Sequence, residues 1–323
     1  MCTAISYRTL NHYFGRTLDL EHTYCETVTV TPRNFTFAFR AKGILSSHYA
    51  MIGMATVSDG YPLYYDAANE CGLAIAGLNF PQNAVYFPKQ SQKDNIAPYE
   101  FIPWILSQCK DLQEVRERLS ALNLCHIPFS KAFPLSPLHW LISDYHGSVT
   151  VESTEDGLHV YENPVGVLTN NPPFPYHMTH LCDYMNLTAA NRENRFKSVP
   201  LQPYSKGMGA IGLPGDLSSA SRFVRAAFVK PNSVSGSGEN ESVSQFFHIL
   251  GAVSQQRGCN ETTDGIYEIT QYTSCINTNL GIYYYTTYEN QCVSAVDMHH
   301  CDLNGTDLYL YPLTKTQFVN RQN

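Results

Sequence analysis

The chain has 323 residues, a length that fits either two domains or one large domain. Apolar residues make up 43% of it and charged residues 15%, which is typical of globular proteins and excludes a disordered chain. The formal net charge of -7, with no basic cluster, argues against a nucleic-acid partner, because such binding requires cations to displace counterions from phosphate.

The sequence favours a cytoplasmic protein that does not insert into a membrane. No stretch of about 18 apolar residues occurs, so we expect no membrane span. The first residues lack the basic and apolar regions of a secretory signal, and we therefore expect most of the ten cysteines to be buried free thiols. No C-x-x-C pair is present, and "MHHCD" at 298–302 is better explained as a turn than as a metal site.

Strand patterns dominate the first hundred residues. Segments 26–32 and 35–40 alternate with period two, which predicts a hairpin with its turn at Arg33 and Asn34. "GLAIAGL" at 72–78 is continuously apolar, as expected for a strand covered on both faces.

Two helices are expected next. "FIPWIL" at 101–106 forms the first. The second begins after Asp111, which makes a D-x-x-E capping signal with Glu114. Its apolar stripe consists of Leu112, Val115, Leu119 and Leu122.

Strand patterns then return, followed by a second pair of helices. The strands are expected at 138–144, 148–153, 158–162 and 165–169. One helix spans 219–230 and ends before Pro231, and the other spans 242–253 after a Ser-x-x-Gln cap, with a flexible loop between them. Three strand-like segments, two of them rich in tyrosine, close the chain. Two stacked, mainly antiparallel sheets with a helical layer outside each would bury these elements, which predicts an α+β fold in one domain over residues 1–323.

The chain begins with "MCTAI", which places a cysteine directly after the initiator methionine. Methionine is trimmed when the next side chain is small, and trimming would leave Cys2 with a thiol and a free α-amine. Such an amine can take the proton of the thiol, as an N-terminal threonine uses its own amine. Cys2 is therefore a candidate nucleophile, and the alternative is that a small second residue has no role here.

"YFGRTLDL" at 13–20 places Arg16 and Asp19 on a strand that is close enough to pair with the first strand. Residues three apart in a straight strand point to opposite faces, so a shared site requires a bend, which Gly15 would permit. The alternative is a surface ion pair.

Asparagines end two apolar strands just before proline. Asn79 precedes Pro81, and Asn170 begins the run "NNPP". Proline prevents the ladder from continuing, and an amide at a strand end can direct its N–H groups at a developing oxyanion. The alternative is an Asx turn. Further along, Arg222 and Arg225 lie on the first turns of a helix, where either can meet an anion or both can be solvated.

Together these segments resemble the choloylglycine hydrolase family, the N-terminal-nucleophile amidases that include bile salt hydrolases and penicillin V acylases. The resemblance covers essentially the whole chain. Its motifs are "MCTAI", "FGRTLDL", "NECGLAIAGLNFP", "LHWLISD", "GVLTNNP", "GLPGDLSSASRFVRAAF", "QFFHIL" and "TQYTSCIN" followed by "GIYYYTTYEN". It implies a four-layer αββα sandwich, a homotetramer, and no metal or organic cofactor.

The resemblance also implies roles for single residues. Cys2 would be the nucleophile and its amine the base, Arg16 would stabilise the thiolate, and Asp19 would orient the amino terminus. Asn79 and Asn170 would be the oxyanion donors.

Two further features follow from the resemblance. Arg222, in preference to Arg225, would be the remaining active-site arginine. Bile salt hydrolases of the family tend to have Asn where the penicillin V acylases tend to have Tyr, and Asn79 favours the bile-salt branch.

The substrate pocket is expected around the loop at 125–140, which has no helical or strand period although it is long and apolar. In the family the corresponding loop covers the steroid. The expected lining residues are Leu18, Tyr65, Phe129, Phe133 and Leu138, together with Leu135 of the same loop.

The implied reaction is hydrolysis of the amide that joins a bile acid to glycine or taurine. A penicillin V acylase, or an acylase for another N-acyl amide, is the alternative within the family. A non-catalytic protein that binds bile acids or sterols, and a structural thiol-rich protein, are the alternatives outside it.

Overall fold

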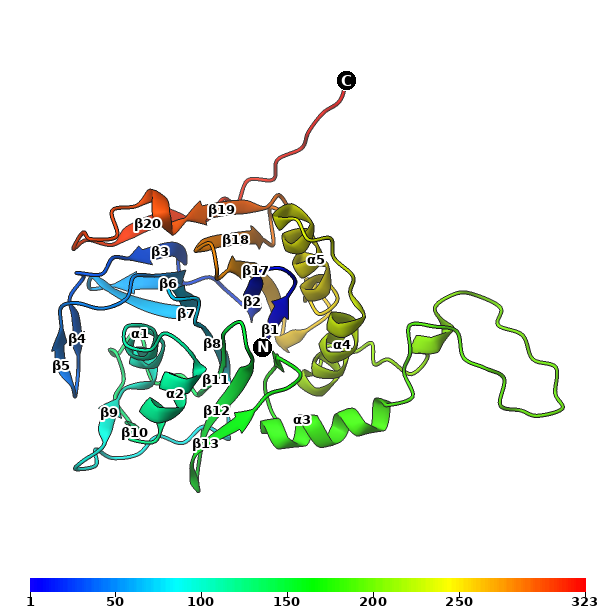
Figure 1. Ribbon diagram of the computed structural model, residues 1–323, viewed down its shortest axis with the longest axis horizontal. Helices are drawn as coiled ribbons and strands as arrows, with labels where there is room; N and C mark the ends of the chain where they lie inside the picture. Colours follow the sequence, from blue (N-terminus) through cyan, green and yellow to red (C-terminus); the bar gives the residue numbers. More distant parts are fainter.

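Two antiparallel sheets stacked face to face form the centre of the molecule, in a computed structural model that describes residues 1–323 (Figure 1). The six-stranded sheet has the order β14 (Val167–Leu168), β1 (Cys2–Arg8), β2 (His12–Leu20), β17 (Ile269–Asn277), β18 (Ile282–Thr287) and β19 (Ser294–Asp297). The eight-stranded sheet has the order β13 (Gly157–Glu162), β12 (Ser148–Thr154), β11 (Leu138–Ser143), β8 (Ala74–Asn79), β7 (Tyr61–Asn69), β6 (Met51–Ser58), β3 (Thr27–Thr31) and β20 (Tyr309–Pro312).

Three short two-stranded sheets lie outside this pair. They join β4 (Phe37–Phe39) to β5 (Gly43–Leu45), β9 (Asp94–Ile96) to β10 (Leu122–Leu124), and β15 (Glu261–Thr263) to β16 (Ile266–Tyr267).

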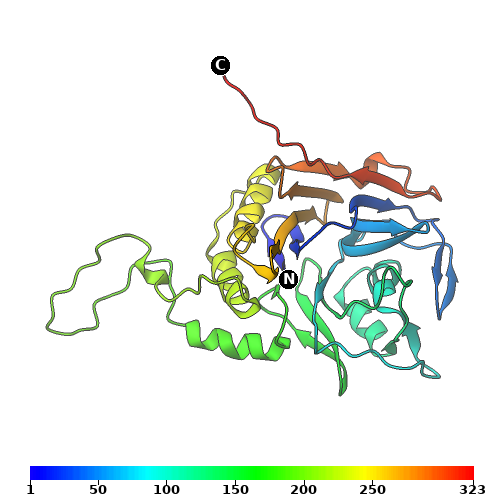
Figure 2. The same cartoon turned by 180° about the vertical axis from the view of Figure 1, so that it is seen from behind.

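Helices cover the outer face of each large sheet. On the eight-stranded sheet lie α1 (Phe101–Leu106) and α2 (Leu112–Leu119), and on the six-stranded sheet lie α4 (Ser219–Asn232) and α5 (Glu239–Gly251) (Figures 1 and 2). One apolar cluster fills the space between the sheets and beneath α4 and α5, and a second packs between the eight-stranded sheet and α1 and α2. The expected αββα sandwich is confirmed.

Local capping signals predicted α2 well. The Asp111 side chain accepts a hydrogen bond from the Glu114 N–H at 3.0 Å, as the D-x-x-E pattern indicates. Leu122, which was expected on the helical stripe, lies instead in β10.

The predicted hairpin between segments 26–32 and 35–40 is wrong. β3 pairs with β6 on one side and with β20 on the other, and β4 pairs with β5. Both segments do contain strands, but their partners lie elsewhere in the chain, and alternation alone does not identify a partner.

Both helices of the second pair differ from the prediction, because α4 ends two residues later than expected and α5 begins three residues and ends two residues earlier. α4 continues through Pro231, because the Asn232 and Ser233 side chains donate to the carbonyls of Phe228 and Val229 at 2.7 and 2.9 Å near the end of the helix. α5 begins at Glu239, three residues before the predicted start.

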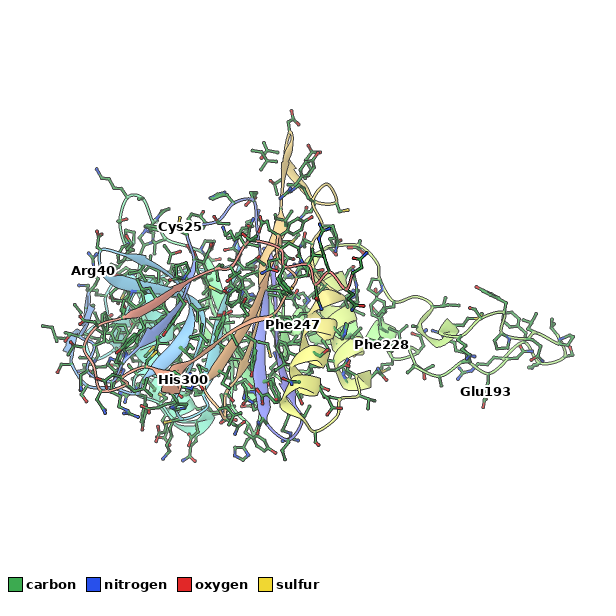
Figure 3. The ribbon with its side chains drawn as sticks, turned by 90° about the horizontal axis from the view of Figure 1, so that it is seen from above. Cys25, Arg40, Glu193, Phe228, Phe247 and His300 are labelled. Carbon is green, nitrogen blue, oxygen red and sulfur yellow. The ribbon has the colours of Figure 1, made fainter.

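The sequence did not predict α3 (Phe174–Leu181) or the long segment that follows it. Residues 185–213 form an arm that leaves the body beyond α3 and α4 and then returns (Figures 1 and 2). Seen from above, Glu193 lies far out on the arm, well beyond Phe228 and Phe247 of the helical layer (Figure 3). No helix in the molecule has the length and apolar character needed to cross a bilayer.

Candidate active site

Cys2 lies at the first position of β1, where this strand starts to pair with β2. It is opposite Leu18, and Ala4 is opposite Arg16. The Cys2 side chain is 2% exposed and lines a cavity of about 260 Å³. A thiol is thus fixed by a strand at the wall of a cavity.

The backbone nitrogen of Cys2 is already held by a predicted site residue. Its N–H donates to Oδ1 of Asn170 at 2.8 Å. Met1 continues the strand pairing, because its α-ammonium donates to the Asp19 carbonyl at 2.6 Å, accompanied by an ion pair with Glu268. Burial lowers the pKa of the Met1 amine from its ordinary value. Removal of Met1 would therefore place a new amine in a buried position next to the thiol.

Arg16 and Asp19 are 1% and 0% exposed, and no ion pair joins them, so the alternative of a surface ion pair is wrong. The Asp19 carboxylate accepts hydrogen bonds from the hydroxyls of Thr17 at 3.1 Å and Thr270 at 2.7 Å. The register of β17 shifts between Thr270 and Tyr272, opposite the end of β2. This irregularity lies where Asp19 leaves the regular ladder.

The bend expected at Gly15 is absent, because β2 runs through this residue as one strand. Gly15 is instead required by the close approach of β17. A Cβ atom at this position would lie 2.1 Å from the backbone oxygen of Ser274, a distance that no side chain tolerates.

The Arg16 guanidinium extends from one sheet to the other beside the cavity. It donates to the backbone oxygens of Tyr65 at 3.2 Å and Gly77 at 2.5 Å. Burial opposes its charge, yet the surrounding acidic groups, with Cys2 first among them, raise the pKa of Arg16 above its ordinary value. A permanent cation therefore lines the same cavity as the thiol.

The two predicted oxyanion donors lie side by side. Nδ2 of Asn170 donates to the Asn79 carbonyl at 2.7 Å, while Oδ1 accepts from Cys2 and Arg222. An amide nitrogen has two N–H groups, so one of those on Asn170 remains for another acceptor. The Asn79 side chain lines the cavity and makes no hydrogen bond. These long-range contacts of Asn170 differ from those of an Asx turn.

The two helical arginines differ in their contacts. Arg222 is 0% exposed and donates to the Cys2 carbonyl at 2.5 Å, to Oγ1 of Thr3 at 2.7 Å and to Oδ1 of Asn170 at 2.7 Å. Burial lowers the pKa of Arg222 from its ordinary value. Arg225 donates only to backbone carbonyls of Pro214, Ala252 and Asp216, away from Cys2.

The cavity wall is mostly apolar and comes from several distant segments. All the predicted lining residues are present, namely Leu18, Tyr65, Phe129, Phe133, Leu135 and Leu138. The cavity is also lined by residues that were not predicted from the sequence, among them Leu20, Tyr24, Leu63, Pro98 and Tyr99. Nothing in their local patterns separates them from ordinary core residues, because apolar side chains near a cavity and in a core have the same composition.

A buried carboxylate next to Tyr65 was also not predicted from the sequence. Asp66 is 0% exposed and accepts hydrogen bonds from the hydroxyls of Ser274 at 2.8 Å and Tyr283 at 2.6 Å, which belong to the opposite sheet. Burial raises the pKa of Asp66, although the nearby Arg16 opposes this effect. Asp66 thus joins the two sheets behind the cavity.

Segment 298–302 forms a turn, as expected. Met298–His300 is a short 3₁₀ helix, and the Asp297 side chain accepts from the His299 N–H at 2.8 Å. No group of three or more His, Cys, Asp or Glu side chains is arranged to hold a metal ion.

Comparisons with known proteins agree along the whole chain. Residues 2–311 match the model of the linear amide C–N hydrolases, choloylglycine hydrolase family. The chain is 52% identical over 314 residues to a bile salt hydrolase/transferase of Lactiplantibacillus plantarum, covering 97% of each chain. It is 39% identical over 330 residues to the bile salt hydrolase/transferase of Clostridium perfringens, covering 100% of both.

Two solved structures have the same fold as this chain. The crystal structure of a mutant conjugated bile acid hydrolase from Clostridium perfringens superposes with a TM-score of 0.92 at 38% identity, covering 100% of each chain. A penicillin V acylase from Agrobacterium tumefaciens shares the fold, with a TM-score of 0.75 at 19% identity over 99% of this chain and 100% of that one.

Proposed function

The chain belongs to the choloylglycine hydrolase family of linear amide C–N hydrolases, and from this premise we propose that Cys2, freed by removal of Met1, is its catalytic nucleophile. The enzyme is a bile salt hydrolase, which cleaves the amide between a bile acid and glycine or taurine. The single observation that supports the catalytic assignment most is the convergence of Asn170 and Arg222 on the backbone of Cys2 at the cavity wall.

In the acylation step, the Cys2 sulfur attacks the amide carbonyl carbon of the substrate, and the α-amine of Cys2 accepts the thiol proton. The carbonyl oxygen becomes an oxyanion, which the remaining N–H of Asn170 and the Asn79 amide stabilise. The ammonium of Cys2 then donates its proton to the departing nitrogen. The C–N bond breaks, glycine or taurine leaves, and a thioester remains on Cys2.

In the deacylation step, water attacks the thioester carbonyl. The α-amine of Cys2 accepts a proton from this water and returns it to the sulfur as the C–S bond breaks. The free bile acid leaves, and the thiol and amine return to their starting state. Arg16 stabilises the sulfur anion in both steps, and Asp19 holds the strand end on which the amine lies.

The apolar cavity suits the steroid of a bile salt, because side chains of the loop at 125–140 line it together with Leu18 and Tyr65. We expect the purified enzyme to release glycine and taurine from glycocholate and taurocholate at least ~10-fold more efficiently than it hydrolyses penicillin V. Amino-acid release and the kcat/KM of each substrate, measured side by side, provide the test.

Two results would overturn this assignment. A preference for penicillin V would make the enzyme an acylase of the other branch. Tight binding of bile salts without any amino-acid release, together with a Cys2 thiol that iodoacetamide does not alkylate, would make it a binding protein.

A homotetramer of this chain is the assembly that we propose, and the arm at 185–213 is its candidate contact. The arm extends away from the body and exposes large apolar side chains, namely Met185, Phe196, Tyr204 and Ile211. Phe196 is 70% exposed and Tyr204 is 85% exposed. A second copy of the chain would cover these side chains and so remove apolar surface from water.

The double substitution Phe196→Ser with Tyr204→Ser is expected to lower the assembly from tetramer to dimer or monomer, because each change removes an apolar anchor. Light scattering after size exclusion measures the mass, and the melting curve shows that the body remains folded. Val234→Ser, which is equally exposed but lies off the arm, is the control and should stay tetrameric. A double variant that remains a tetramer, or a monomeric wild-type enzyme, would contradict the proposal.

We also propose a cytoplasmic location. All ten cysteines are free thiols, but only four of them are buried, fewer than the sequence predicted, and the six at positions 25, 71, 182, 259, 292 and 301 are exposed or half-buried. This state is typical of proteins in a reducing compartment.

A further inference from the structure

The proposed oxyanion donor Asn170 is held at its backbone as well as at its side chain. Its N–H donates to the hydroxyl of Ser219 at 2.8 Å, and its carbonyl lies 2.9 Å from Nε2 of His177. The contacts with Cys2, Arg222 and Asn79 use all the hydrogen-bonding capacity of the amide side chain except one N–H. The direction of that N–H therefore depends on these side-chain contacts and on the groups that hold the Asn170 backbone.

His177 is the fourth residue of α3 and is 0% exposed. Because a carbonyl can only accept, Nε2 of His177 carries the proton and donates it to Asn170. The ring stacks on Phe223 with centroids 4.7 Å apart and an interplanar angle of 21°. Nδ1 is buried and has no partner. Burial lowers the pKa of His177 to about 4, so that the ring is neutral at pH 7.

This arrangement is unfavourable as packing alone. A buried nitrogen without a partner reduces stability, and a phenylalanine at this position would stack on Phe223 without that loss. What phenylalanine lacks is the Nε2–H group that holds the Asn170 carbonyl. The neighbouring His139 makes a related contact, since its Nε2 lies 2.9 Å from the Thr169 carbonyl, but its Nδ1 is paired with Glu152 at 3.0 Å.

We propose that His177 is a positioning residue for the oxyanion site. Its hydrogen bond to the Asn170 carbonyl fixes the backbone that presents the remaining amide N–H to the substrate oxygen. The inference rests on the proposed function, because it assigns to His177 a task in the same reaction. His177 does not touch the substrate, and it acts only through Asn170.

The test is His177→Phe, which keeps the stacked ring and removes the donor. We expect kcat for taurocholate to fall ~10- to 100-fold, because a small displacement of a catalytic group has effects of this size. The KM, the melting temperature and the rate at which iodoacetamide alkylates Cys2 should stay near the wild-type values, since alkylation requires the thiol but no oxyanion donor. His180→Phe on the same helix, where the histidine is half-buried and pairs with Asp183, is the matched control and should keep its kcat.

A second pair of variants distinguishes the hydrogen bond of His177 from its packing. The same pair tests the proposal if the phenylalanine variant does not fold. His177→Gln keeps an N–H donor of similar length, and His177→Met has nearly the same shape without a donor. We expect a higher kcat from the glutamine variant than from the methionine variant. Equal kcat values in this pair, an undiminished kcat in His177→Phe, or a loss of alkylation in parallel with kcat would each overturn the proposal. If the wild-type enzyme itself released no taurine, the proposed function would fail instead.

Discussion

An enzyme that carries a leader in front of Cys2 is expected to be inactive until the leader is cut off at that residue. In the leader-bearing chain the Cys2 nitrogen belongs to a peptide bond, so its lone pair is delocalised into the carbonyl and cannot accept the thiol proton, and its N–H donates to Asn170. Because a general base contributes about 10²- to 10⁴-fold, we expect taurocholate hydrolysis to be at least ~100-fold slower before cleavage than after it.

The experiment uses a leader that ends in the recognition sequence of a site-specific protease which cleaves immediately before Cys2. Intact mass follows the cleavage, and released taurine is measured before and after it. The same leader on a Cys2→Ala chain is the control, which should be inactive in both states. Undiminished hydrolysis by the uncleaved chain would rule out the amine of Cys2 as the base. For the wild-type enzyme without a leader, we expect the intact mass of the active protein to show that Met1 has been removed.

The second large effect is expected from Asn170→Asp. An aspartate keeps an oxygen for the Cys2 nitrogen and for Arg222, but it has no N–H for the substrate oxygen. Loss of one oxyanion donor lowers kcat by about 10²- to 10³-fold, and we expect a fall in this range for taurocholate with a much smaller change in KM. Steady-state kinetics of taurine release measure both quantities.

The adjacent Asn171→Asp is the matched control for this variant. Asn171 donates to the Pro81 carbonyl at 2.5 Å, so its replacement also removes an amide contact to the segment after β8, but makes no change beside Cys2. We expect it to retain its kcat within a few-fold. A near-normal kcat in Asn170→Asp, or an equal loss in both variants, would remove Asn170 from the oxyanion site.

Much of the fold could be predicted because its signals are local. The cap at Asp111 joins residues three apart, and the alternation within β3 lies in five residues. Which strands pair with one another could not be predicted from such local signals. The segment 26–32 paired with β6 and β20 rather than with its sequence neighbour, since pairing depends on which strands a sheet brings together.

The candidate site divides in the same way. The motifs around Cys2, Arg16, Asn79 and Asn170 were recognisable as residue patterns, and the roles assigned to them remain predictions. Other lining residues of the cavity could not be recognised from the sequence. Tyr24 and Tyr99, for example, become lining residues only after their segments fold against the loop at 125–140. The requirement for glycine at position 15 also depends on tertiary structure. It arises from the close approach of Ser274 on β17, which lies 258 positions from the neighbouring Arg16 in the chain.

By itself the sequence determined the family, the layered α+β class and the identity of a cysteine that follows the initiator methionine. Only the tertiary structure decided what surrounds this cysteine. Asn170 and Arg222 lie 168 and 220 positions from Cys2 in the chain, yet they hydrogen-bond to its nitrogen and its carbonyl. The physical reason is that capping and periodicity act over a few residues, whereas burial brings together polar groups from distant segments, which must then satisfy one another's hydrogen bonds.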